Sequence, residues 1–141
     1  MIVPLPDLES LRVLGDWVAL RLQPGDAVLL SGPLGAGKTA LARAILRRLS
    51  GDAALEVPSP SFTLVQSYET RLGWVHHFDL WRLEGPQAVE ELGWDELVQD
   101  IVLVEWPDRL GALRPAGALD IALGMLPGGA RQAVLHGWKS R

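Results

Sequence analysis

The segment Gly32-Pro33-Leu34-Gly35-Ala36-Gly37-Lys38-Thr39 constrains this chain more than any other part of the sequence. It fits the phosphate-binding P-loop pattern, G-x-x-x-x-G-K-[ST], without a mismatch. Glycines let the backbone approach a phosphate closely and turn its N–H groups towards the anion. Lys38 would then reach the β- and γ-phosphates, and the Thr39 hydroxyl would bind Mg²⁺. The pattern therefore predicts a site for a nucleoside triphosphate.

The residues on both sides of this segment support the match. Residues 27–31 are mostly apolar and predict a buried strand before the loop, and residues 40–49 predict a helix after it. The positive end of that helix would face the phosphates. We therefore expect the nucleotide-binding residues to be Gly32, Pro33, Leu34, Gly35, Ala36, Gly37, Lys38, Thr39 and Ala40.

Length, charge and cysteine content limit the remaining possibilities. A chain of 141 residues suits one domain with a substantial core, so we expect 1–141 to form a single P-loop domain. The absence of cysteine excludes disulfides and thiolate metal sites. A net charge of −4 argues against a large DNA or RNA interface. No signal segment is visible, and no apolar stretch approaches the roughly 20 residues that cross a bilayer. We expect a cytoplasmic protein without membrane contacts.

Hydrophobic periodicity predicts an alternation of helices and strands. Apolar residues recur at helical spacing over 8–22, after Asp7 as the helix-capping residue. The apolar run 101–104 suits a central strand that is covered on both faces. The other expected elements are strands at 62–68 and 74–80 joined by a loop at 69–73, helices at 87–92, 94–99 and 107–113, and a terminal hairpin of 119–126 and 130–136. This order predicts an α/β fold, a P-loop NTPase-like mixed β-sheet flanked by helices.

A P-loop needs a carboxylate that holds Mg²⁺ or its water shell, usually at the carboxyl end of a neighbouring strand. Glu105 directly follows the apolar run 101–104 and is the best candidate. The metal would then be held by Thr39 and Glu105. The alternative is a strand-end glutamate that faces water. Trp106 comes next, and it could pack in the core or lie against a base.

A second cluster of polar residues covers 76–82. In a strand, His77 and Asp79 share one face, and Asp79 could orient an attacking water or complete the metal shell. Arg82 could pair with Asp79 or with a phosphate, for which its planar fork is well shaped. The alternative is an ion-paired end of a hairpin. Two histidines without a cysteine or a second ligand cluster make a poor zinc site.

A third cluster is the polar, proline-stiffened segment 59–63, which follows the P-loop in sequence. If this segment lay over the γ-phosphate, the hydroxyls of Ser61 and Thr63 would sense the state of the nucleotide, as switch loops do. The alternative is a connecting loop.

These clusters, in this order behind a P-loop, resemble the TsaE family, also called YjeE, the small bacterial ATPases of tRNA threonylcarbamoyladenosine formation. The matching segments are 32–39, 59–65, 77–83, 91–93 and 105–107. The similarity runs from about residue 7 to residue 110. The combination is specific, whereas a P-loop alone occurs in many enzymes.

The resemblance implies slow ATP hydrolysis that is coupled to two partner proteins, TsaB and TsaD. In that family TsaD transfers the threonylcarbamoyl group to adenosine 37 of tRNA, and TsaE supports repeated cycles, so tRNA contact is expected only through the complex. By this resemblance Lys38 holds the phosphates of ATP, Thr39 and Glu105 serve Mg²⁺, and Asp79 supports hydrolysis. Ser61 and Thr63 would form the switch.

Three residues depart from the family pattern. Ser61 stands where threonine is usual and keeps the hydroxyl, Pro33 replaces an acidic residue, and Trp81 lacks the phenolic oxygen of the usual tyrosine. Two other functions remain open from the residues. A small-molecule or nucleoside kinase also combines a P-loop with an aspartate, but it normally adds an acceptor pocket and an arginine-bearing lid. A non-catalytic nucleotide-binding scaffold is the third possibility.

Overall fold

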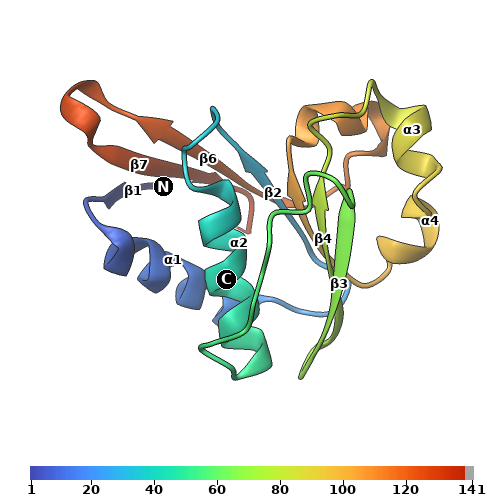
Figure 1. Ribbon diagram of the computed structural model, residues 1–141, viewed down its shortest axis with the longest axis horizontal. Helices are drawn as coiled ribbons and strands as arrows, with labels where there is room; N and C mark the ends of the chain where they lie inside the picture. Colours follow the sequence, from blue (N-terminus) through green and yellow to red (C-terminus); the bar gives the residue numbers. More distant parts are fainter. Residues whose placement is uncertain (139–141) are drawn as a thin grey trace.

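The core of the protein is a mixed sheet whose strands lie in the order β1-β7-β6-β2-β5-β4-β3 (Figure 1). The computed structural model describes residues 1–138, so positions 139–141 of the predicted domain lie outside it. The strands are β1 (Ile2–Leu5), β2 (Ala27–Ser31), β3 (Val65–Thr70), β4 (Gly73–Asp79), β5 (Ile101–Glu105), β6 (Leu119–Met125) and β7 (Arg131–His136). The neighbours β6, β2, β5 and β4 run parallel, and antiparallel strands pair on both sides of them. The predicted mixed α/β fold is confirmed.

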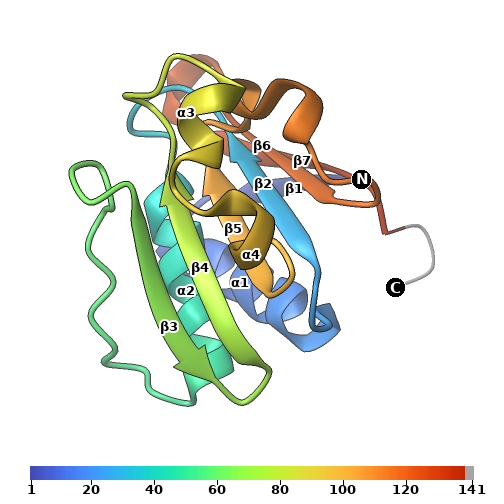
Figure 2. The same ribbon diagram turned by 90° about the vertical axis from the view of Figure 1, so that its right-hand side faces the viewer.

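Helices cover both faces of this sheet. One face carries α1 (Leu8–Arg21) and α2 (Lys38–Ser50), and the other carries α3 (Pro86–Glu90), α4 (Trp94–Leu97) and the 3-10 segment η1 (Pro107–Leu113). Figure 2 shows α3 and α4 in front of the sheet and the first two helices behind it. A short 3-10 turn, η2 (Pro127–Gly129), joins β6 to β7. In residues 1–138 no helix combines the length and apolar character that crossing a membrane requires.

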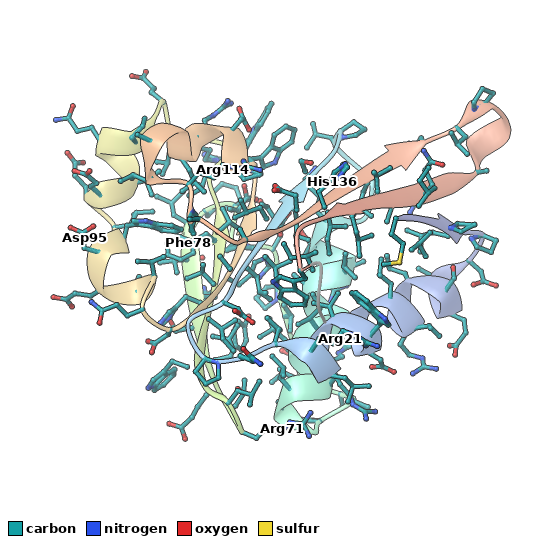
Figure 3. All side chains as sticks on the ribbon, turned by 180° about the vertical axis from the view of Figure 1, so that it is seen from behind. Arg21, Arg71, Phe78, Asp95, Arg114 and His136 are labelled. Atoms are coloured by element: carbon teal, nitrogen blue, oxygen red, sulfur yellow. The ribbon has the colours of Figure 1, made fainter. Side chains whose placement is uncertain are left out.

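The sheet separates two apolar clusters, which explains the continuous apolar run of β5. Ile101 and Leu103 pack on the α1–α2 side, whereas Val102 and Val104 pack on the side of α3 and α4. All four are fully buried. Phe78 of β4, labelled in Figure 3, lies on the second side. Its ring meets the ring of Trp94 edge-on, with 5.2 Å between the ring centres. Each strand therefore contributes alternate side chains to two separate cores.

Local signals set the ends of the long helices. The Ser10 N–H donates to Asp7 Oδ1 over 2.8 Å, and the Asp7 N–H donates to Ser10 Oγ over 3.2 Å. These two bonds form a capping box and confirm Asp7 as the cap of α1. Helix α2 is followed by its cap residue Gly51, which has φ 69° and donates its N–H to the last turn. Glycine suits this left-handed position because it has no Cβ.

The predicted positions of two segments were wrong. The strand expected at 62–68 begins at Val65 and continues to Thr70, so only 71–72 lie in the turn that was expected to span 69–73. Leu64 has φ 70°, and its N–H donates to the Pro60 carbonyl over 2.7 Å, so a tight turn occupies the residues before the strand. Strand β1 was not predicted; it is a short edge strand, where a proline is tolerated.

Helices α1 and α2 approach each other closely at Gly15. A Cβ atom added there would lie 2.5 Å from the Ala44 Cβ. We expect Gly15→Ala to lower the free energy of unfolding by about 1–3 kcal/mol through overpacking, although alanine favours helix formation. Urea denaturation would measure this change. Gly124→Ala is the control, because its Cβ would meet nothing within 4 Å. Equal stability of the two variants would contradict the close packing.

Candidate nucleotide-binding site

Three neighbouring parallel strands end at the same edge of the sheet, and the residues at their ends build the site. Leu30 of β2 pairs in register with Glu105 of β5, and Glu105 pairs in register with Asp79 of β4. The chain leaves β2 at Ser31 and enters the P-loop directly. Because parallel strands point the same way, the loop and both predicted carboxylates meet at one edge. Ligands of open α/β sheets bind at such carboxyl ends.

The P-loop backbone requires its glycines. Gly32, Gly35 and Gly37 have φ of 142°, 78° and 105°, values that other residues rarely adopt. At Gly32 a Cβ would also collide with the carbonyl oxygen of Leu123 on β6, so the loop packs directly against the neighbouring strand. Gly37 is the cap residue of α2, which begins at Lys38. The loop therefore delivers the chain to the positive end of a helix, as anion binding requires.

Lys38 folds back over its own loop. Its Nζ donates to the carbonyl oxygens of Gly32 and Pro33 over 2.6 and 2.9 Å, and lies 4.2 Å from the ring centre of Trp106. Burial lowers the pKa of Lys38, while the Glu105 and Asp79 carboxylates act in the opposite direction. The site thus gathers a partly desolvated cation and two carboxylates, a combination suited to a highly charged ligand.

Glu105 is buried against Thr39 and does not face water. Its residue is 3% exposed, and Thr39 Oγ1 lies 3.0 Å from Oε1 and 2.9 Å from Oε2. A hydroxyl that donates its hydrogen to a carboxylate keeps lone pairs for a cation. Hydroxyl and carboxylate oxygens are hard donors of the kind that Mg²⁺ takes together with phosphate oxygens. The residues present therefore fit the predicted metal.

A further contact to Glu105 was missing from the sequence prediction. His77 Nε2 lies 2.6 Å from Glu105 Oε2, and the His77 side chain is 0% exposed. Its other ring nitrogen, Nδ1, has no hydrogen-bond partner within residues 1–138. Alternation along the strand had placed His77 on the same face as Asp79. The sequence alone gave no sign that its ring reaches a residue 28 positions away.

Asp79 connects the site to the predicted switch segment. Ser61 Oγ donates to Asp79 Oδ2 over 3.2 Å, and the Trp81 N–H donates to Oδ1 over 3.0 Å. The Asp79 N–H donates to the Leu64 carbonyl over 3.0 Å. Thr63 is exposed and accepts from Gln66 Nε2 instead. The structure thus brings Ser61 to the carboxylate and leaves Thr63 outside this contact.

Arg82 does not pair with Asp79 in the part of the chain that is described. Its guanidinium lies 4.4 Å from the ring centre of Phe62, on the switch segment. Arg82 therefore contacts the switch segment through an aromatic ring that is itself exposed.

A tryptophan pair begins beside Lys38, with Trp106 over the lysine and Trp81 against Trp106. The Trp106 and Trp81 rings are 4.4 Å apart between centres, and the Arg109 guanidinium is 5.8 Å from the Trp81 ring. Trp106 packs against the second apolar cluster and also contacts Lys38. Contact of its ring with a nucleotide base stays a prediction. Trp81 is 44% exposed.

A P-loop between a parallel strand and a helix, with carboxylates at the ends of the adjacent strands, defines a P-loop nucleotide-binding protein. The particular family follows from comparison with known proteins. A family model described as "Threonylcarbamoyl adenosine biosynthesis protein TsaE" matches residues 5–132. The chain belongs to the TsaE family, which confirms the resemblance found in its motifs.

Individual relatives agree with this assignment. The protein named "tRNA threonylcarbamoyladenosine biosynthesis protein TsaE" from Rickettsia felis is 35% identical over 119 residues, which cover 84% of this chain and 69% of that protein. The protein of the same name from Nostoc is 34% identical over 136 residues, covering 93% and 82%. The crystal structure of YdiB from Bacillus has the same fold, with a TM-score of 0.80, 24% identity, and coverage of 97% and 84%.

The environment of Glu105 predicts a metal-specific defect in a variant. Removal of the carboxylate in Glu105→Ala should raise the Mg²⁺ concentration needed for tight nucleotide binding about tenfold or more, because one hard donor is lost. Titration of a fluorescent ATP analogue at several Mg²⁺ concentrations would measure this shift. Asp100→Ala is the control, because that carboxylate contacts His76 away from the P-loop. A Mg²⁺ dependence equal to that of the wild type would contradict the assignment of Glu105.

Proposed function

We propose that this protein is a Mg²⁺-dependent ATPase that works with TsaB and TsaD in forming N6-threonylcarbamoyladenosine at position 37 of tRNA. The observation that carries the proposal is the pairing of Thr39 with the buried Glu105 behind an intact P-loop, in a chain of the TsaE family. In this role the protein acts in the cytoplasm, supports repeated cycles of the modification, and meets tRNA through the complex.

Hydrolysis by this site would proceed by in-line attack of water on the γ-phosphate. Mg²⁺ held by Thr39 and Glu105 would supply charge neutralisation on the phosphate oxygens. Lys38 would leave the carbonyl oxygens of its loop and stabilise the charge that spreads over the γ-phosphate. Asp79, at the end of the adjacent strand, would accept a hydrogen bond from the attacking water and orient it.

The switch would act through the Ser61–Asp79 contact. Because Ser61 bonds directly to the carboxylate, movement of residues 59–63 changes the freedom of Asp79 to hold water. We propose Ser61 as the primary sensor of the nucleotide and Thr63 as a second switch residue that engages when the segment moves. This arrangement supports coupling between nucleotide state and a surface that partner proteins can reach.

The free protein should turn over slowly. An arginine that contacts the transferring phosphate contributes about 10³–10⁵ in rate. The arginines that flank this site, Arg82 and Arg109, lie on the rings of Phe62 and Trp81. A partner that supplied such a group, or released one of these, would accelerate hydrolysis. The kinase alternative is not favoured, because the chain belongs to the TsaE family.

Turnover assays test the proposal directly. We expect slow phosphate release by the protein alone and a marked increase with TsaB and TsaD of the same organism. Lys38→Ala should abolish both activities, because it removes the cation that contacts the phosphates. Arg48→Ala, exposed at the far end of the same helix, is the matched control and should retain them.

Two results would contradict the proposal. One is unchanged turnover in Lys38→Ala protein, which would remove the P-loop from the mechanism. The other is transfer of the phosphate to an added nucleoside or metabolite without stimulation by the pair, which would identify a kinase.

A further inference from the structure

Two consecutive histidines on β4 have different environments. His76 uses both ring nitrogens: Nδ1 lies 2.7 Å from Ser67 Oγ, and Nε2 lies 2.9 Å from Asp100 Oδ2. His77 points to the opposite face, where Nε2 contacts Glu105 and Nδ1 has no partner within residues 1–138. The chain therefore carries one fully hydrogen-bonded histidine beside one that is only half satisfied.

The contact with Glu105 places a hydrogen on one nitrogen of the His77 ring. A carboxylate accepts hydrogen bonds and donates none, so at 2.6 Å the hydrogen must be on His77 Nε2. Nδ1 is a polar atom that is buried without a hydrogen-bond partner within residues 1–138, an arrangement that disfavours folding. On the same face of the strand, Val75 is an apolar residue in a fully buried position. A histidine at position 77 is therefore not explained by packing.

We propose that His77 is the positioning residue of Glu105, an inference that rests on the proposed Mg²⁺–ATP site. His77 holds Oε2 from one side while Thr39 reaches both carboxylate oxygens from the other, over 2.9 and 3.0 Å. A glutamate fixed by two donors on different elements loses the rotamer freedom of its long side chain before any ligand binds. Partners behind metal-binding residues orient them in this way, and losing one commonly weakens metal binding 10–100-fold, roughly.

Two substitutions of His77 separate the loss of its hydrogen bond from the loss of its volume. His77→Leu fills the buried space with an apolar side chain and removes the donor. His77→Gln keeps an N–H group at about the place of the imidazole Nε2, so it should restore the contact. His76→Leu is the matched control, because it removes a neighbouring histidine that also contacts a carboxylate but faces away from the P-loop.

The first measurement is the Mg²⁺ concentration that gives half-maximal binding of a fluorescent, non-hydrolysable ATP analogue, together with the melting temperature of each ligand-free variant. We expect His77→Leu to raise the Mg²⁺ midpoint about tenfold or more. Its melting temperature should fall no further than that of His76→Leu, because leucine fills the buried space while Glu105 loses one of its donors. His77→Gln should return most of the wild-type midpoint. His76→Leu should lower the melting temperature, because it breaks two hydrogen bonds, and leave the Mg²⁺ midpoint unchanged.

A second measurement needs neither metal nor nucleotide. Nitrogen-15 NMR of the histidine rings should show His77 as the Nε2–H form, and Glu105→Ala should shift this signal while the His76 signal stays in place. A His77 signal that is unchanged in Glu105→Ala would show that the ring does not bond to Glu105.

The outcomes separate this inference from the proposed function. If the wild type binds the analogue with Mg²⁺ and His77→Leu binds it with the same midpoint, the positioning role is overturned and the proposed function stands. If the wild type shows no Mg²⁺-dependent binding at all, the proposed function fails, and the inference fails with it. A defect in His77→Leu that His77→Gln does not restore, together with a fall in melting temperature larger than that of His76→Leu, would identify a purely structural histidine.

Discussion

The buried carboxylate of Glu105 is the group on which the site depends. Transfer of a carboxylate out of water is unfavourable unless hydrogen bonds replace its hydration. The replacement donors are Thr39 from the first turn of α2 and His77 from β4. Each of the three groups lies on a different element, so their meeting requires the parallel pairing of β2, β5 and β4. The backbone pairing that forms the sheet therefore brings both donors to the Glu105 carboxylate and places the start of α2 beside it.

The residue after Glu105 adds a second constraint. Trp106 has φ 58° and ψ 55°, a left-handed conformation that costs a non-glycine residue about 1–3 kcal/mol. Its N–H donates to the Leu30 carbonyl over 3.3 Å, which holds the turn against β2. In this conformation the indole lies over Lys38 and against Trp81. The strained backbone at Trp106 therefore places an aromatic ring beside Lys38, at the edge of the sheet that carries Glu105 and Asp79.

The parts of this arrangement that follow from contiguous patterns could be predicted from the sequence. The P-loop is one continuous segment, so its motif predicts it. Glu105 directly follows the apolar run 101–104, so the expected strand predicts its place at the edge of the sheet. The ring of His77 and the hydroxyl of Ser61 reach partners far along the chain, and no local pattern states which of Ser61 and Thr63 turns inward. The wrong start predicted for β3 has a local cause. Leu64 is left-handed and ends a turn, although the residue types at 62–64 favour a strand.

The direct test of the nucleotide site is a crystal structure with Mg²⁺ and a non-hydrolysable ATP analogue. We expect phosphates in the loop of residues 32–37, Lys38 moved from its loop carbonyls to the phosphates, and Mg²⁺ bound to the Thr39 hydroxyl. Glu105 should remain bonded to His77. The competing place for phosphates is a groove of about 660 Å³ between α1 and α2, which is lined by Asp16 and by Arg12, Arg43, Arg47, Arg48 and Arg71. Phosphates bound in that groove, with the P-loop free of nucleotide, would contradict the account.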